Sequence, residues 1–490
     1  MSITTIVLMI IFIFAFIPLV IAEFARARSV PTVEDFFLQS RKMPMLMSFF
    51  TVYATWVSSF AFFGAPTSFY LEGPMYMTCF AWNILFGLLF MIIGRRIWFY
   101  GKTAGMITPT DFFDEIYHSK LLNIISTLVL VVFTVPYLMI QLYAGACIVE
   151  TASNGVIPWR AAGMVFYLVI IIYLWAGGLR AVAMTDVFYG IFTFAVMILC
   201  GAILIAKTGG VAETFGVIMQ RDSGAVLLGH GRDVLAPITW ICMFIIIPLG
   251  ALMGPPIWIR IFAVRNESQF RLMPLLLAVV TIMYIGPLLT GSAAAVLYPN
   301  MHSPNNLILD TIIRNTSVIG GTVLLCGVAT SALSTANSQI HALAAIYTID
   351  IHRRAVKRDA TEKTLVSTGK WSVLIISAAV YVLMLQKPGM IIDTGTVGMG
   401  GTAQIIVPTL GALFWNKSHP RAAETGLILG IAIFSAILIF TNVPAVHAAM
   451  AALLVNGACF VLLSLFLKEN RYTCEKISYY REIFRKRHFS

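Results

Sequence analysis

Charge is scarce in this sequence. Only 11% of the 490 residues are Asp, Glu, Lys or Arg, whereas a soluble domain carries roughly 25%. A water-soluble globular protein is therefore excluded. Seven cysteines are scattered without a CxxC pair, so a zinc site or a disulfide framework is not expected.

The motifs of ATP-driven pumps and of hydrolases are also missing. The chain contains no Walker loop and no HExxH set, and its eight histidines form no ligand pattern. We therefore expect no enzymatic activity, no cofactor and no direct drive by ATP.

Long apolar segments are abundant instead. Apolar residues make up 59% of the chain, and the mean hydropathy is +0.88. A segment of about 20 apolar residues spans a bilayer, and the stretch 3–21 contains no charge. The sequence predicts an all-α membrane protein with about 13 transmembrane helices, near 4–22, 46–72, 76–98, 119–149, 158–176, 182–206, 236–258, 273–297, 319–349, 371–386, 396–415, 424–441 and 445–467.

The first span has an alternative interpretation as a secretory signal peptide. It lacks a basic segment before the apolar run, and no small-residue cleavage site is convincing around Ala22. We expect this span to be a retained helix.

The net charge of +11 is explained by alternating loops. Basic residues gather in every second loop, which predicts that those loops are cytoplasmic; one of them contains Arg260, Arg265 and Arg271. The segment after residue 467 is basic too, so the C-terminus is predicted inside and, with 13 spans, the N-terminus outside. We expect a multi-pass protein of the cell membrane, a bacterial inner or plasma membrane, with lipid and no nucleic acid as a partner.

Five regions follow from this pattern. They are an extra helix and loop at 1–45, two five-helix segments at 46–206 and 236–415, two further helices at 416–467, and a basic cytoplasmic tail at 468–490. The tail predicts a short amphipathic helix with Ile477, Tyr480, Ile483 and Phe484 on one side.

The second and seventh spans contain helix breakers. Gly64 and Pro66 interrupt one, and Pro248, Gly254 and Pro255 interrupt the other. Broken spans at matching places in two halves are typical of transporters with inverted repeats. The alternative is a pair of merely kinked helices.

The ninth span presents a row of hydroxyl groups. Ser331, Ser334, Thr335 and Ser338 follow i, i+3, i+4, i+7 spacing and share one helix face. Oxygen ligands suit hard cations, so this face is a candidate cation site. The alternative is ordinary packing, because small hydroxylated residues are common between membrane helices.

Asp186 begins the sixth span. Acids inside a membrane are rare and usually functional, so it is a candidate for binding a cation or for a proton pathway. The alternative is a helix cap at the cytoplasmic edge, with Thr185 beside it.

Aromatic and polar residues near the breaks form a candidate solute site. Such a mixture suits a small, partly apolar solute fixed by a few polar groups. The candidates are Trp56, Ser58, Phe60, Gln141 and Trp240, and core packing is the alternative for each aromatic.

Several motifs together resemble the sodium:solute symporter family. They are Glu34-Asp-Phe-Phe-Leu-Gln-Ser-Arg-Lys-Met-Pro44, Thr108-Pro-Thr-Asp-Phe-Phe113, Gly177-Gly-Leu-Arg-Ala-Val-Ala-Met-Thr-Asp186, the loop that begins at Arg260, and the helix Ser331–Ser338. The resemblance implies a LeuT-type fold with a 5+5 inverted repeat and discontinuous second and seventh helices.

The resemblance also implies positions for the coupling ion. A sodium site would use the backbone carbonyls of Ala54 and Val57 with Ser331, Ser334 and Thr335. A second cation would use Asp186, Ser338 and Asn337. Two departures weaken the second site, because Asn337 replaces a hydroxyl residue and Tyr189 stands where the family has glutamine.

We therefore expect a sodium-coupled symporter of a small organic solute, monocarboxylate-like or amino-acid-like, that works by alternating access. Two alternatives remain: a proton-coupled symporter that uses Asp186, and a membrane sensor that reports the solute to a partner kinase.

Overall fold

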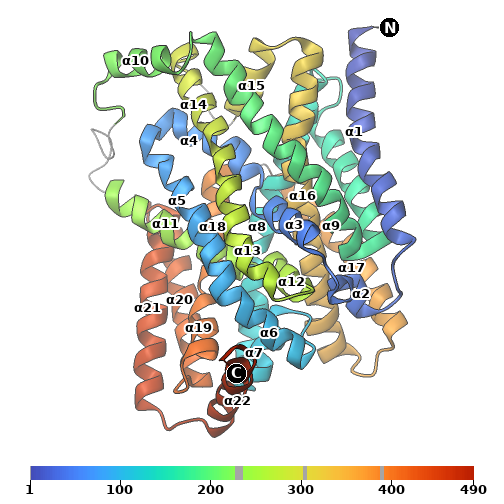
Figure 1. The fold of residues 1–490 in the computed structure, drawn as a ribbon, viewed down its shortest axis with the longest axis vertical. Coiled ribbons are helices and arrows are strands. Elements are labelled where there is room, and N and C mark those ends of the chain that lie inside the picture. The colour runs from blue at the N-terminus through green and yellow to red at the C-terminus, as the bar shows by residue number, and fades with distance from the viewer. Residues whose placement is uncertain (1, 227–235, 302–305, 387–390, 490) are drawn as a thin grey trace.

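The computed structural model describes residues 2–226, 236–301, 306–386 and 391–489, and these form a bundle of helices without named strands (Figure 1). The N-terminus and the C-terminus lie at opposite ends of the bundle. The helices are α1 (Ile3–Arg26), α2 (Val33–Leu38), α3 (Met45–Trp56), α4 (Ala65–Glu72), α5 (Thr78–Leu89), α6 (Arg95–Ala104), α7 (Pro109–Tyr117), α8 (Lys120–Ala152), α9 (Trp159–Lys207), α10 (Val211–Arg221), α11 (Ala236–Met253), α12 (Pro255–Ala263), α13 (Ser268–Val280), α14 (Ile285–Leu297), α15 (Leu307–Asn315), α16 (Val318–Ile346), α17 (Glu362–Met384), α18 (Ile391–Ala403), α19 (Ile406–Phe414), α20 (Pro420–Phe440), α21 (Ala445–Phe466) and α22 (Arg471–Phe489).

The number of spans agrees with the sequence prediction. Among the described residues, 10 helices are long and apolar enough to cross a membrane, and up to 12 if each of two bent pairs counts as one span. Helix α9 has 49 residues and would be roughly 74 Å long if straight, more than twice the thickness of the hydrocarbon core. It is divided at Gly178, which has φ 51° and ψ −141°, so the total is thirteen.

Gly178 is required at that division for two reasons. Its positive φ is a conformation that a residue with a side chain rarely adopts. A Cβ atom there would also lie only 2.4 Å from the Phe36 carbonyl oxygen. The short helix α2 can therefore pack directly against the turn.

Both predicted breaks are present. Helix α3 is bent by 53° from the segment Phe60–Glu72, which consists of a π-helical turn (Phe60–Gly64) and α4, and α11 and α12 are bent by 58° from each other. Each broken span is the first of a run of five spans, and this order confirms the predicted arrangement.

Helix α16 lies at the centre of the bundle, beside α3, α8 and α9 (Figure 1). In its most apolar window 78% of the residues are buried, whereas in α1, at the edge of the bundle, only 17% are buried. The row of hydroxyl residues therefore faces protein and not lipid.

One predicted boundary was wrong. The tenth span was expected at 371–386, but α17 begins at Glu362, where the side chain of Thr361 caps the helix by accepting a hydrogen bond from the backbone N–H of Thr364. Its polar first turns extend beyond the apolar segment that a hydropathy pattern detects.

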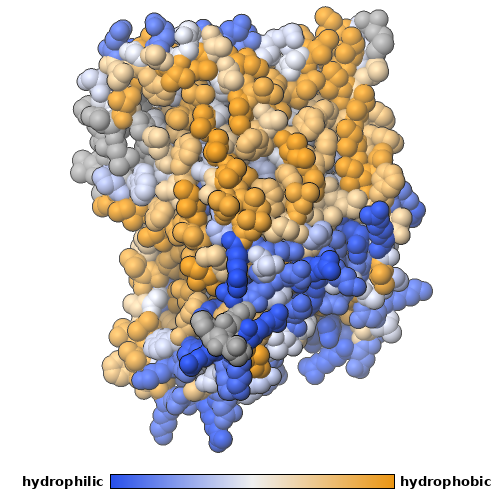
Figure 2. Space-filling model, viewed as in Figure 1, coloured by the Kyte–Doolittle hydropathy of each residue, from blue (hydrophilic) through white to orange (hydrophobic). Residues whose placement is uncertain are grey.

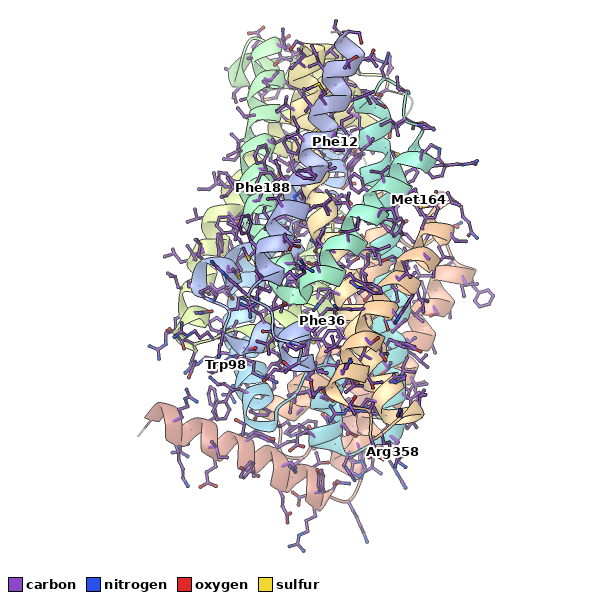
Figure 3. The ribbon with its side chains drawn as sticks, turned by 90° about the vertical axis from the view of Figure 1, so that its right-hand side faces the viewer. Phe12, Phe36, Trp98, Met164, Phe188 and Arg358 are labelled. Atoms are coloured by element: carbon purple, nitrogen blue, oxygen red, sulfur yellow. The ribbon has the colours of Figure 1, made fainter. Side chains whose placement is uncertain are left out.

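The C-terminal tail, which forms α22, lies at the polar end of the molecule. Hydrophilic side chains gather at one end of the bundle (Figure 2), and α22 lies across it (Figure 3). The predicted amphipathic helix is confirmed, because Ile477, Tyr480 and Phe484 are buried and Ile483 is partly buried. The Tyr480 ring stacks on Tyr100 at 4.5 Å.

Candidate functional site

The break in the second span leaves backbone oxygens without helical partners. Val57 ends α3 in an extended conformation, with φ −85° and ψ 96°. Normal i to i−4 bonding stops there, and the carbonyl of Ala54 accepts hydrogen bonds from side chains of another helix instead. Ala54 and Val57 are both buried.

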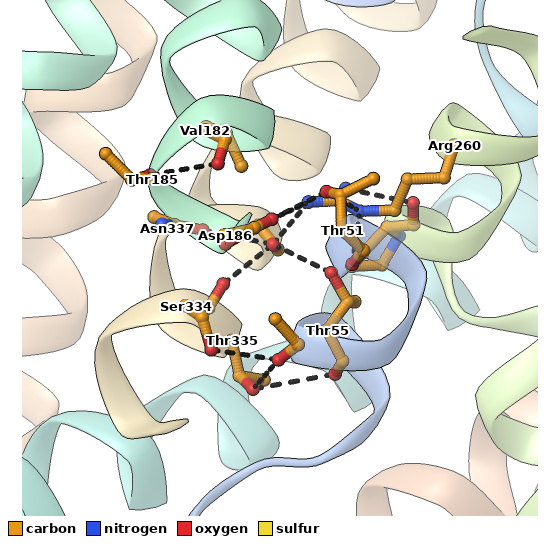
Figure 4. A network of polar contacts seen from close by, with 12 residues as sticks. Thr51, Thr55, Val182, Thr185, Asp186, Arg260, Ser334, Thr335 and Asn337 are labelled. Carbon is orange, nitrogen blue, oxygen red and sulfur yellow. Dashed lines mark hydrogen bonds and ion pairs between the residues drawn. The ribbon is translucent and has the colours of Figure 1, made fainter. Parts of the chain in front are cut away.

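The hydroxyl face of α16 meets this break (Figure 4). Ser334 Oγ lies 2.9 Å and Thr335 Oγ1 lies 3.2 Å from the Ala54 carbonyl oxygen. Thr335 Oγ1 is also 3.5 Å from the Thr55 carbonyl oxygen. Ser331 donates to its own helix, at the carbonyl of Val328. The structure thus brings together three of the five predicted sodium ligands, with Val57 at the end of α3 and Ser331 one turn away.

Asp186 lies in the interior, not at a helix end. It is fully buried, and its carboxylate accepts a hydrogen bond from Thr51 Oγ1 at 2.6 Å. Thr185 donates to the carbonyls of Ala181 and Val182 and caps nothing. The capping alternative for Asp186 is therefore wrong.

Arg260 provides the charge that balances Asp186. Its Nη2 atom lies 3.6 Å from Asp186 Oδ2 and donates to Ser338 Oγ, and its Nε donates to Thr51 Oγ1 at 3.1 Å. The sequence pattern assigned Arg260 to a cytoplasmic loop, and that assignment is wrong because the residue lies within α12 and is fully buried. A lone arginine in the apolar run 257–263 was the signal that could have revealed it.

The three residues predicted to hold a second cation are close together. Ser338 Oγ donates to Asn337 Oδ1 at 3.0 Å, and both Ser338 and Asp186 contact Arg260. Asn337 Nδ2 and Asp186 Oδ1 are buried and have no hydrogen-bond partner among the described residues. The guanidinium group therefore lies between two of the proposed cation ligands.

A cavity lies between the two breaks, beside the hydroxyl row. Its volume is about 50 Å³, below the roughly 300 Å³ at which ligand pockets begin, so the walls are drawn together in this conformation. The lining residues are Thr55, Trp56, Phe133, Thr134, Tyr137, Gly250, Ala251, Gly254, Pro255, Pro256, Ile257, Gln339, Gly398, Met399 and Thr402.

Of the five predicted solute residues, only Trp56 lines the cavity. Trp56 also stacks on Phe86. Ser58 and Gln141 stabilise the break. Ser58 Oγ is 2.6 Å from the Tyr137 hydroxyl, and Gln141 Oε1 accepts a hydrogen bond from the backbone N–H of Ser59 at 2.9 Å. Phe60 packs against Trp82 and Gly395. Trp240 is outside the cavity, near the start of α11, where its carbonyl faces Thr78.

The start of α12 presents few free donors to the cavity. Pro255 and Pro256 have no N–H group, and the N–H groups of Ile257 and Trp258 donate to the Gly254 carbonyl at 3.1 and 3.4 Å. Free N–H groups at a helix N-terminus are the backbone groups that could hold an anion. In this conformation the first-turn donors of α12 are already engaged.

Comparison with known structures defines the fold. A Na+-coupled sialic acid symporter in a substrate-bound outward-open state superposes with a TM-score of 0.81 over 95% of this chain and 98% of that chain, at 15% identity. MHP1, a nucleobase-cation-symport-1 family transporter in a closed conformation, gives a TM-score of 0.59 over 90% of this chain and 97% of that chain, at 12% identity. The fold is of the LeuT type.

Curated relatives cover nearly the whole chain. The osmoregulated proline transporter OpuE of Bacillus subtilis is 24% identical over 85% of this chain and 86% of its own length. The sodium/pantothenate symporter of Escherichia coli is 23% identical over 90% of this chain and 92% of its own length. The sodium:solute symporter family matches residues 36–430. This chain belongs to the sodium:solute symporter family.

Proposed function

We propose that this sodium-coupled symporter binds its ion between α3 and α16, where the Ala54 carbonyl meets the hydroxyls of Ser334 and Thr335. This convergence of three buried oxygens is the observation that supports the proposal. A hydroxyl hydrogen can rotate, so oxygens that now donate can turn their lone pairs towards a cation. The carbonyl of Val57 and the hydroxyl of Ser331 complete the proposed ligand set.

We propose that a single sodium ion drives each cycle. The second cation site was predicted at Asp186, Ser338 and Asn337, but the Arg260 guanidinium contacts two of these residues. A fixed positive charge there repels a second cation, and the carboxylate it pairs with is already neutralised. Arg260 thus acts as an internal cation of the protein.

The solute is proposed to bind in the cavity beside the second-span break. Its walls combine apolar side chains, such as Trp56, Phe133 and Met399, with a few hydroxyl and amide groups, which suits a small, partly apolar organic solute. Relatives named as proline and pantothenate transporters support an amino-acid-like or monocarboxylate-like solute.

Coupling follows from the position of the ion. Sodium bridges α3 and α16, so it stabilises the conformation in which these helices lie together, and it shifts the equilibrium only by its difference in affinity for the two states. Thr55 connects the two sites, because its carbonyl faces Thr335 and its side chain lines the cavity. A potential of 100 mV adds about 2.3 kcal/mol per charge moved, enough for roughly fifty-fold accumulation.

The experiment is solute uptake into proteoliposomes with and without an inward sodium gradient. We expect uptake that depends on sodium with a Hill coefficient near 1, as a single ion requires. Replacing Ser334 and Thr335 together with alanine removes two of the proposed ligands, so the sodium concentration for half-maximal uptake should rise by roughly tenfold or more.

The matched control is Thr330→Ala on the same helix. Thr330 is also buried, but its hydroxyl donates to Gly327 of α16 and faces Thr193, so sodium dependence should be unchanged. Sodium-independent uptake, or an Asp186→Asn variant that loses only pH-driven uptake, would favour proton coupling. Sodium-dependent binding without any accumulation would favour a sensor.

A further inference from the structure

Gln339 is distinctive among the polar residues of the cavity. It lies one turn beyond Thr335 on α16, is 3% exposed and lines the cavity. Its Oε1 atom is buried and has no hydrogen-bond partner among the described residues. A buried carboxamide oxygen left unpaired costs about 1–3 kcal/mol. We therefore expect the solute to supply a hydrogen-bond donor to this oxygen.

Three other polar side chains of the cavity are already engaged. The Tyr137 hydroxyl is 2.6 Å from Ser58 Oγ, and Thr55 Oγ1 is 3.0 Å from Ser338 Oγ. Thr402 donates to the Gly250 carbonyl at 2.9 Å. These hydroxyls fix the breaks in place, whereas the Gln339 Oε1 atom has no partner among the described residues.

None of the described residues that line the cavity is Asp, Glu, Lys, Arg or His. Arg260, on the helix that contributes Pro255 and Pro256, is occupied by Thr51, Ser338 and Asp186. Since the first N–H groups of α12 also have partners, the group that the cavity is built to recognise is not an anion.

We propose that Gln339 Oε1 accepts a hydrogen bond from an N–H or O–H group of the solute, and that this contact selects amino-acid-like, amide or hydroxy solutes over simple monocarboxylates. The inference rests on the proposed function and decides between the two solute classes that remain open there. A site built around a hydrogen bond rejects an analogue that lacks the partner, because the buried group is then left unpaired. Gln339 is thus a specificity-determining residue.

The test uses pairs of probes that differ in one donor. L-proline and cyclopentanecarboxylate share a five-membered ring and a carboxylate but differ in the ring N–H, and L-alanine, lactate and propionate form a second set. Sodium-dependent thermal stabilisation of the purified full chain measures binding. We expect the donor-bearing members to bind roughly ten- to a hundredfold more tightly than their partners.

Two variants assign that preference to the residue. Gln339→Met keeps the size but removes the hydrogen bond, so the preference within each pair should collapse towards unity. Thr330→Ala changes a buried residue of the same helix that faces Thr193 and not the cavity, and it should keep the preference of the unmodified protein. Stabilisation by sodium alone, measured without solute, should be the same in both variants.

The outcomes separate this inference from the function on which it rests. A donor-free carboxylate that binds as tightly as its donor-bearing partner, a Gln339→Met variant that keeps the preference, or a panel in which no donor-bearing solute binds would each overturn the role of Gln339. Loss of sodium stabilisation in the unmodified protein would instead overturn the proposed ion site.

Discussion

Thr51 connects the two charged side chains at the centre of the molecule. Its hydroxyl donates to Asp186 at 2.6 Å and accepts from Arg260 Nε at 3.1 Å, while the two charges approach within 3.6 Å. Taking both groups out of water costs several kcal/mol each, and this cost is offset only while each retains its partners. The pair therefore constrains how α3, α9 and α12 fit together.

Removing one charge should destabilise the protein more than removing both. Asp186→Asn leaves a buried guanidinium without its counter-ion, and Arg260→Gln leaves a buried carboxylate, so we expect losses of about 3–5 kcal/mol for each. The double variant, which is neutral, should regain part of that loss. The measurement is the melting temperature of each purified variant.

An exposed ion pair serves as the control for this comparison. Arg471 and Glu475 lie 2.6 Å apart, with side chains 92% and 63% exposed, so Arg471→Gln should leave the melting temperature unchanged. Single variants at Asp186 or Arg260 that melt like the unmodified protein would contradict the proposed coupling.

At the residue scale, the sequence predicted which side chains could bind a cation better than it predicted which residues those side chains contact. The spacing of Ser334 and Thr335 identified their shared face, because helical periodicity is local. It could not reveal that Arg260 reaches Asp186 and Ser338, since those contacts join α9, α12 and α16 across the bundle. Gln339 was missed for the same reason, because its unpaired oxygen is visible only once the surrounding side chains are placed.

Among the elements, α22 follows the last membrane span and lies outside the spans. Tyr480 stacks on Tyr100, and Phe484 meets Phe99 edge-on at 5.2 Å. Lys476 Nζ lies 2.6 Å from Glu115 Oε1. The hydrophobic period of the tail predicted which side would be buried, but not that α6 and α7 provide the surface.

The ion pair that joins the tail to α7 should persist through neutral pH. The hydrogen bond to Glu115 raises the pKa of Lys476 above its ordinary value of 10.5. A raised pKa means that the stabilising contact is complete below the ordinary value and is lost only as the pH rises through the raised one. Packing, not titration, should therefore control docking of the tail under physiological conditions.

Replacing Tyr480 and Phe484 together with alanine should release the tail. The variant loses the ring contacts with Tyr100 and Phe99 and the apolar area that they bury. Trypsin should therefore cut the basic segment 481–487 faster than in the unmodified protein. Tyr479→Ala is the matched control, because Tyr479 is 53% exposed. Equal cleavage rates in all three proteins would show that α22 is not held by this face.

Among the described residues of the whole molecule, the number of spans is odd only because α9 is two helices. The residues from 159 to 207 are mostly apolar with a few charges. The sequence prediction nevertheless placed two spans there, at 158–176 and 182–206, with Gly177, Gly178 and Arg180 between them. The positive φ of Gly178 supports that choice. Undivided, the same segments would give an even count and would put both termini on one side.

The orientation of the termini is the test at this scale. Basic loops predict the C-terminus inside, and the N-terminus and α22 lie at opposite ends of the bundle (Figure 1). We expect green fluorescent protein fused after Ser490 to fluoresce and alkaline phosphatase fused there to be inactive. A peptide tag before Met1 should be reached by antibody on intact spheroplasts. Reporters that place both termini in the cytoplasm would mean an even number of spans. They would contradict the division at Gly178, and with it the path that carries Asp186 into the centre of the bundle.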